Sequence, residues 1–144
     1  MRASIVDDEL LQEEAFERYL DHYRHPRNRQ ALPQAQAVGT IEWAGGAMLT
    51  YSLQLGRKQE GSLVIERAAF QSQRCGIAAA YASLLSEWVR GRPVEEEWRI
   101  DPVELMRQFG PRAGAIDAAG RAISALRQAL AQVPGAGPTE PIRV

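Results

Sequence analysis

The sequence predicts an α+β fold, in which a small and mostly antiparallel sheet lies between an N-terminal helix and a helical second half. Three observations predict it. Apolar residues near the N-terminus recur at helical spacing, residues 48–55 alternate between apolar and polar, and the alanine- and leucine-rich second half again has the helical period. The length of 144 residues fits one domain of ordinary size.

A first helix is expected over about residues 8–25. Apolar residues recur there at spacings of three and four, and Asp7 and Asp8 supply negative charge at the start. Pro26 should end this helix, because the residue before a proline is pushed out of the α region. A loop rich in glutamine, alanine and proline then leads to the sheet.

Three strands are expected next, over residues 38–43, 48–55 and 63–70. The second is the clearest, because apolar residues alternate with polar ones along it, as in a half-buried strand: Leu49, Tyr51, Leu53 and Leu55 against Thr50, Ser52 and Gln54. The polar segment 56–61 should form a hairpin between the second and third strands, which makes the sheet mostly antiparallel.

Three helices are expected in the second half. One spans residues 77–89 and is closed by Gly91 and Pro93, and a short one opens at Asp101. The last helix should bury one apolar face, made of Ile116, Ala119, Ile123, Leu126 and Leu130. We expect residues 1–132 to form a single domain and residues 133–144, which contain three prolines, to form a flexible tail.

The composition excludes several functions. The chain has 17 basic and 18 acidic residues, so no strong charge favours nucleic acid as a partner, and no apolar run reaches the ~18–20 residues of a membrane span. The acidic N-terminus argues against a secretion signal, so we expect a cytoplasmic protein. The single cysteine, Cys75, rules out an internal disulfide and an all-thiolate metal site within one chain.

Three segments carry motifs at compatible separations. The first is DHYRHPRN at residues 21–28, and the second runs from residue 64 through Cys75-Gly76 to ASLLSEWVRGR at residues 82–92. The third is Pro111-Arg112, followed by Ala122-Ile123 in the last helix. Together they resemble the U-type iron–sulfur cluster scaffold family, which includes IscU, SufU and the N-terminal domain of NifU, over about residues 15–131.

The resemblance implies a specific fold and function. The fold would be IscU/SufE-like α+β, with a three-stranded antiparallel sheet, helices packed on one face, and the functional loops gathered at one end. The function would be in iron–sulfur cluster assembly, as a scaffold protein rather than an enzyme. Family members hold a nascent [2Fe–2S] cluster, or zinc in its place, with three cysteines and an assisting aspartate or histidine.

The chain departs from this pattern at the ligand positions. The family's Cys-Gly-Asp motif reads Ala44-Gly45-Gly46 here, and its third cysteine falls on Ala115. Only the middle cysteine, Cys75, is kept. Iron–sulfur clusters and zinc require several soft donors, so we expect no metal site and no conventional cluster on one chain.

Cys75 follows a strand and precedes a helix, so its sulfur should lie near free N–H groups at a helix N-terminus. Arg74 replaces a residue that is commonly glycine in the family and would add a cation beside the sulfur, at a cost of about 1 kcal/mol if the position needs a positive φ. These features predict a lowered thiol pKa. Cys75 is therefore our candidate persulfide acceptor or residual cluster ligand, with Arg74 tuning the thiolate.

Several interpretations stay open. The favoured one is an IscU/NifU-like protein of cluster assembly or sulfur trafficking that accepts persulfide sulfur on Cys75 from a cysteine desulfurase, as SufE does. In the second, two copies bridge a cluster through one Cys75 each, so a homodimer is one option. In the third, the protein is a chemically inert pseudo-scaffold that binds and regulates cluster-assembly partners, and Cys75 is simply a small buried residue.

Overall fold

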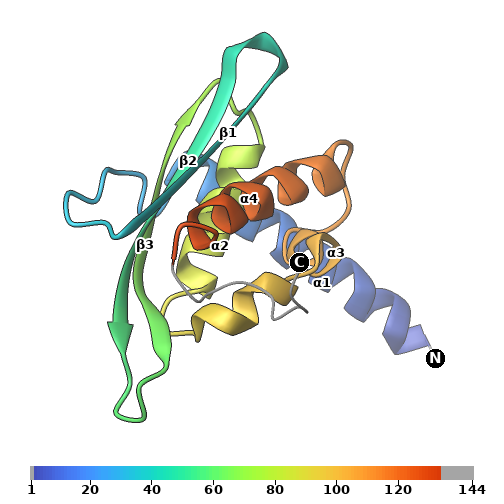
Figure 1. The fold of residues 1–144 in the computed structure, drawn as a ribbon. Coiled ribbons are helices and arrows are strands. Elements are labelled where there is room, and N and C mark those ends of the chain that lie inside the picture. Colours follow the sequence, from blue (N-terminus) through green and yellow to red (C-terminus); the bar gives the residue numbers. More distant parts are fainter. Residues whose placement is uncertain (1, 134–144) are drawn as a thin grey trace, which may run out of the picture.

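The computed structural model describes the backbone of residues 2–133 and the side chains of residues 10–95 and 99–133. Figure 1 shows a three-stranded sheet with helices packed on one face, so the predicted α+β fold is confirmed. In chain order the elements are α1 (Arg2–Arg24), β1 (Ala37–Trp43), η1 (Ala44–Gly46), β2 (Ala47–Arg57), β3 (Leu63–Gln73), α2 (Ala78–Trp88), η2 (Val94–Arg99), α3 (Pro102–Arg107) and α4 (Ala115–Leu130).

The sheet has the order β1-β2-β3, and both pairings are antiparallel. Leu49, Tyr51 and Leu53 of the central strand are fully buried against the helices, as the predicted alternation requires, whereas Leu55 is only partly buried and Ser52 on the opposite face is buried as well. The predicted hairpin joins β2 to β3. Strand β3 continues to Gln73, three residues beyond the predicted end, because Gln73 still pairs with Met48.

The loop between α1 and β1 lies on the side of the sheet away from the helices (Figure 1). The carbonyl oxygen of Asn28 accepts a hydrogen bond of 2.9 Å from the amide of Phe70 in β3. Further along, the amide of Gln36 donates to the carbonyl oxygen of Leu53 in β2. The loop thereby ties the end of α1 to the edge strand β3 and then to the centre of the sheet.

Helix α4 packs against β1 and the core through a stripe of small residues that starts at Ala115 and runs through Ala119, Ala122 and Ala129. The expected burial is correct for Ala119, Ile123, Leu126 and Leu130 but wrong for Ile116, which is 44% exposed. Ala115 begins the buried stripe, and Ile116 lies one 100° step away from it. The small side chains let the helix approach the sheet closely.

Helix α1 starts at Arg2, six residues before the expected start, and ends before Pro26 as predicted. Its described side chains are buried at Ala15, Tyr19 and His22. Four of the apolar residues that suggested the helix are exposed instead: Leu10, Leu11, Phe16 and Tyr23. Figure 1 explains the exposure of Leu10 and Leu11, because the N-terminal part of α1 projects beyond the rest of the fold, whereas Tyr23 lies at the C-terminal end of the helix.

The start of the expected tail, Val133, is buried against the core, and the remainder of that segment, 134–144, lies outside the described residues. Between residues 2 and 133, no helix combines the length and apolar character that crossing a membrane requires.

Replacing Gly39 by alanine should destabilise the protein strongly. A Cβ atom at residue 39 would lie 2.0 Å from the amide nitrogen of Ala129, so β1 and α4 would have to move apart. We expect the free energy of unfolding in urea to fall by at least about 2 kcal/mol. Gly120→Ala is the matched control, because its Cβ would meet nothing within 4 Å and alanine favours the helix; it should raise stability by up to about 1 kcal/mol. Equal effects of both changes would contradict this packing.

A polar network joins the end of α1 to α2. Nδ1 of the buried His22 lies 2.7 Å from Oγ of Ser83, which also accepts a hydrogen bond from the amide of Arg27. Arg27 pairs with Asp21, and Nε2 of His22 lies 3.8 Å from a carboxylate oxygen of Glu87. Burial lowers the pKa of His22, and the charge of Arg27 lowers it further, so the folded protein holds this imidazole neutral.

This network predicts that acid destabilises the fold through His22. The unfolded chain binds a proton at the ordinary histidine pKa of about 6.5, whereas the folded chain binds it at a lower pH. The contribution of neutral His22 is therefore complete above pH ~6.5 and is lost as the pH falls toward the folded-state pKa. Urea unfolding between pH 8 and 5 should show this loss, and His22→Gln should reduce the slope. His25→Gln, at an exposed site, is the control; an equal slope for both variants would exclude this role of His22.

Candidate functional site

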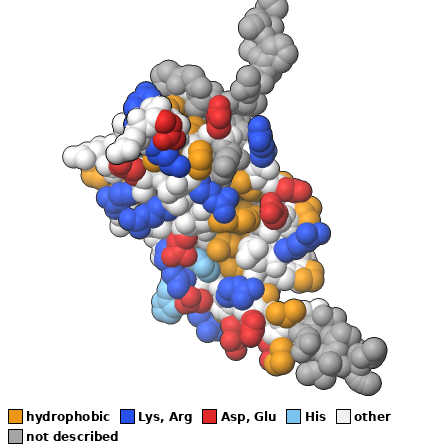
Figure 2. Space-filling view, turned by 90° about the horizontal axis from the view of Figure 1, so that it is seen from below, with side chains coloured by type: hydrophobic (Ala, Val, Ile, Leu, Met, Phe, Trp, Pro, Cys, Tyr) orange, Lys and Arg blue, Asp and Glu red, His pale blue; other side chains and the backbone are white. Residues whose placement is uncertain are grey.

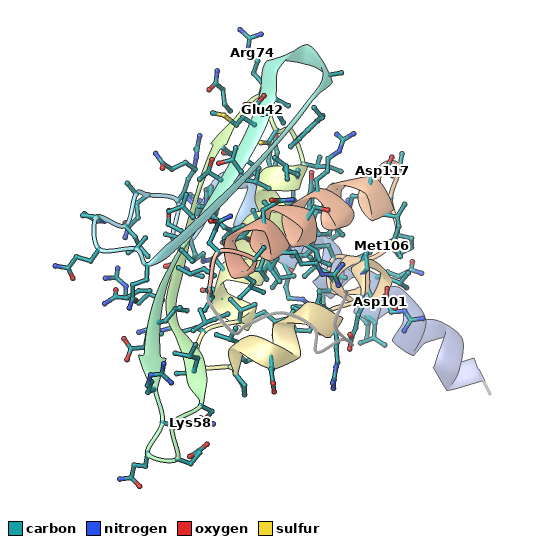
Figure 3. The ribbon with its side chains drawn as sticks, in the orientation of Figure 1. Glu42, Lys58, Arg74, Asp101, Met106 and Asp117 are labelled. Atoms are coloured by element: carbon teal, nitrogen blue, oxygen red, sulfur yellow. The ribbon has the colours of Figure 1, made fainter. Side chains whose placement is uncertain are left out.

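Three loops meet at one end of the fold: the turn η1 between β1 and β2, the Cys75 loop after β3, and the start of α4. Nη1 of Arg74 lies 3.5 Å from the carbonyl oxygen of Gly45, and a Cβ atom on Gly114 would lie 4.0 Å from the side chain of Ile77. Figure 3 shows Arg74 at this end, next to the β1–β2 turn, and Lys58 on the hairpin at the opposite end. The structure thus brings together the three loops that hold the family's ligand positions, at residues 44–46, Cys75 and Ala115.

The three substituted ligand positions offer no donor side chain. Ala44 and Gly46 are exposed in η1, and Ala115 is buried at the first position of α4. Among the side chains that the structure describes, no three histidine, cysteine or acidic residues are grouped to hold a metal ion. A [2Fe–2S] cluster or structural zinc needs about four soft donors, so the residues present here do not fit either group.

The Cys75 thiol is half-buried and points toward backbone carbonyl groups. Its Sγ donates a hydrogen bond of 2.9 Å to the carbonyl oxygen of Met48 and lies 3.6 Å from that of Gln73. Helix α2 begins at Ala78, three residues after Cys75, and the hydrogen-bond partners of Sγ are carbonyl oxygens of strand residues and not the expected N–H groups at the first turn of this helix. Burial raises the pKa of the Cys75 thiol above its ordinary value, which corrects the prediction of a lowered pKa. The reason is that burial removes water from around the sulfur, which disfavours the charged thiolate.

Arg74 adopts the left-handed conformation, with φ of 55°, that its replacement of glycine implies. An arginine costs about 1 kcal/mol more than glycine in this conformation. Its guanidinium extends toward the carbonyl oxygen of Gly45. The cations that act to lower the pKa of Cys75 are instead Arg29 and Arg121, and they only partly offset the effect of burial.

Sequence reasoning missed both of these arginines. Arg29 lies 46 positions before Cys75 and reaches it because residue 29 forms a parallel bridge with Phe70 of β3. Arg121 comes from α4, where its guanidinium stacks on the ring of Trp43 at 4.5 Å. The run of arginines after α1 was visible in the sequence, but no local signal connected it to the cysteine.

Cys75 opens onto a pocket of about 360 Å³. The pocket is lined by residues from the end of α1, the following loop, the end of β3 and the start of α2: Tyr23, Pro26, Arg29, Ser72, Arg74, Cys75, Gly76 and Ala79. The pocket therefore holds one sulfur atom together with Arg29 and Arg74, and of these two arginines Arg29 acts on the charge of Cys75. Such a site suits a sulfur species that carries negative charge, because the arginines stabilise an anion beside the sulfur.

Comparison with known proteins identifies the family. The model of the NifU-like N-terminal domain family matches residues 15–137. The chain belongs to this family. The relatives include the iron-sulfur cluster assembly scaffold protein IscU of Haemophilus influenzae, 31% identical over 93 residues, a match that covers 65% of this chain and 74% of that protein. IscU of Azotobacter vinelandii is 34% identical over 95 residues, covering 65% and 73% respectively.

The fold of this NifU-like domain also matches a solved structure. A crystal structure of a hypothetical protein superposes with a TM-score of 0.51 at 19% identity, over 83% of this chain and 90% of that one. The family and the fold predicted from the three sequence segments are therefore confirmed. The single cysteine marks the chain as a divergent member.

Alkylation of Cys75 should require alkaline pH. Because burial raises the pKa of the thiol, the iodoacetamide rate should rise only above the ordinary thiol pKa of about 8.5. Arg29→Gln and Arg121→Gln should each move the midpoint to still higher pH, since each removes a cation that favours the thiolate. Lys58→Gln, at the opposite end of the fold, should leave it unchanged. A midpoint below 8 in the unmodified protein would contradict this geometry.

Proposed function

We propose that this NifU-like domain serves iron–sulfur cluster assembly by accepting persulfide sulfur on Cys75. The observation that carries the proposal is the chemistry of the site: one thiol lines a pocket with Arg29 and Arg74, while the other family ligand positions hold alanine or glycine. Relatives at 31–34% identity are named cluster assembly scaffold proteins, which supports a role in the same process. The domain takes sulfur from a partner and does not turn over a substrate of its own.

The transfer needs no oxidant or reductant. The Cys75 thiolate attacks the terminal sulfur of a persulfide carried by a cysteine desulfurase, a new S–S bond forms, and the old S–S bond breaks to leave the donor thiolate. Cys75 must first lose its proton, which burial of the sulfur disfavours, and it must give up its hydrogen bond to Met48. Arg29 and Arg121 offset part of this cost and would stabilise the anionic persulfide that results.

A cluster held by a single chain is disfavoured by the donor set. Cys75 is the only thiol, and the positions of the other family ligands present Ala44, Gly46 and Ala115. The sulfur is therefore passed on to a second protein of cluster assembly, in the cytoplasm, rather than built into a cluster here. A cysteine desulfurase is the partner that this chemistry requires.

The second candidate is an inert pseudo-scaffold that occupies the partners of cluster assembly without chemistry. One observation favours it specifically, namely that burial raises the pKa of Cys75 and so favours the unreactive thiol form. In that case the partner-binding surface is the functional part, and replacement of Cys75 would leave function intact.

Intact-mass measurement separates the two candidates. After incubation with a cysteine desulfurase and cysteine, the acceptor proposal predicts an adduct of about 32 Da, the mass of one sulfur atom, that dithiothreitol removes. Cys75→Ser should show no adduct, and Arg29→Gln should slow its formation several-fold. If the unmodified protein binds the desulfurase but gains no mass, the acceptor proposal fails and the pseudo-scaffold remains.

A further inference from the structure

The loop residue Asn28 is held in a backbone conformation that side chains rarely adopt. Its φ is 61°, and among the residues that the structure describes the one other non-glycine residue with a positive φ is Arg74. Asparagine tolerates this left-handed conformation better than most residues, and strain of this kind persists only where surrounding contacts enforce it. Arg74 lines the Cys75 pocket. Asn28 directly precedes Arg29, which lines the same pocket.

Hydrogen bonds join Asn28 to the two elements on either side of Cys75. Strand β3 leads into the Cys75 loop, and α2 begins three residues after Cys75. The carbonyl oxygen of Asn28 accepts a hydrogen bond of 2.9 Å from the amide of Phe70 in β3. Its side-chain amide donates another of 2.9 Å to Oγ of Ser86 in α2, and this buried hydroxyl donates in turn to the carbonyl oxygen of Ser83. The position of residue 28 is therefore fixed relative to the thiol.

Arg29 differs from its neighbour Arg27 in having no acidic partner among the described side chains. Arg27 pairs with Asp21 and lies 4.0 Å from a carboxylate oxygen of Glu87. Figure 2 shows these mixed charges as red side chains among the blue ones beside the pale blue histidines, which lie at the end of α1. Arg29 is exposed, and no ion pair joins it to a side chain that the structure describes. Its charge acts on Cys75 instead, in the direction that favours the thiolate.

We propose that Asn28 is a positioning residue, which holds the charge of Arg29 in the Cys75 pocket and thereby makes the site selective for anionic sulfur donors. The bonds to Phe70 and Ser86 fix the backbone from which the side chain of Arg29 starts. Without them the exposed arginine would sample many conformations away from the sulfur. This selectivity serves the proposed transfer of sulfur to Cys75, on which its biological role rests, although the charge at the pocket can be measured without a desulfurase.

The selectivity follows from the charge of the attacking thiolate. A thiolate repels an approaching anion, so a cation held beside it has its largest effect on donors that carry negative charge. A cationic donor gains nothing from Arg29 and is repelled by it. The pocket therefore distinguishes sulfur donors by their charge, and it fits a donor that is negatively charged at or next to the sulfur to be transferred.

Two methanethiosulfonate reagents of similar size and opposite charge test this selectivity. The sulfonatoethyl reagent is an anion and the trimethylammonioethyl reagent is a cation, and each forms a mixed disulfide with the Cys75 thiolate and releases methanesulfinate. The ratio of the two rates cancels differences in the thiolate fraction and reports the charge at the pocket. Arg29→Gln should lower the ratio of the anionic to the cationic rate several-fold at low salt. Asn28→Gly keeps the positive φ but removes the bond to Ser86, and it should cause at least about half of that loss on a logarithmic scale.

A double variant distinguishes positioning from a general structural effect. If Asn28 acts through Arg29, then Asn28→Gly should not change the ratio further in the Arg29→Gln background. Ser86→Ala removes the other partner of the same hydrogen bond while favouring the helix, and it should resemble Asn28→Gly. Thr40→Val is the control, because it removes a side-chain hydrogen bond of 2.8 Å within the sheet and should leave the ratio unchanged even where it lowers stability.

Three outcomes would overturn the proposal. The first is a ratio that Arg29→Gln lowers but that both Asn28→Gly and Ser86→Ala leave unchanged. The second is an equal loss from Asn28→Gly with and without Arg29, and the third is a ratio that Arg29→Gln does not change. None of them involves a desulfurase, so a failure of sulfur transfer in the mass experiment would refute the proposed function and not the charge selectivity of the pocket.

Discussion

The antiparallel register of β2 and β3 fixes the environment of the single thiol in this chain. Met48 pairs with Gln73 at the end of the ladder, so the chain turns immediately afterwards and Cys75 donates a hydrogen bond of 2.9 Å to the carbonyl oxygen of Met48. Burial raises the pKa of Cys75 and so favours the protonated thiol over the thiolate. Any reaction of the Cys75 sulfur must first break its hydrogen bond to Met48.

The loop after α1 and the helix α4 bring the arginines that lie around this thiol. The loop after α1 is hydrogen-bonded to β3 at Phe70 and brings Arg29 to the pocket, while α4 approaches β1 across Gly39 and brings Arg121 toward Trp43. The fold of the family is kept, whereas the donor atoms at the substituted ligand positions are absent. An arginine-bordered thiol suits an anionic sulfur species better than a metal ion, because the same charges that stabilise an anion repel a cation.

The fold could be predicted from sequence because its signals are local. The strand β2, the glycine-containing hairpin and the stop at Pro26 were each predicted from neighbouring residues, and each is confirmed. Burial along the helices was less predictable. Periodicity identified α1 and α4 but did not show that Phe16 faces solvent or that Ala115, and not Ile116, begins the buried stripe.

The site could be predicted only in part, because its chemistry depends on contacts between distant segments. The positive φ of Arg74 followed from its replacement of a glycine. The direction of the Cys75 pKa did not follow from the neighbouring residues, since it depends on the burial of the sulfur among segments that are distant in the chain. The neighbouring residues predicted that the sulfur lies at a helix N-terminus, whereas the pairing of β2 with β3 places it against the carbonyl oxygen of Met48.

Sulfane sulfur and iron measured on the same sample test the central claim, that the site carries sulfur and not a cluster. The protein would be loaded anaerobically with a cysteine desulfurase, cysteine and ferrous iron, desalted, and assayed by cyanolysis and by metal analysis. The account predicts cyanide-reactive sulfur approaching one atom per chain, its loss in Cys75→Ser, and iron at background. Iron and acid-labile sulfide bound in equal amounts would contradict it.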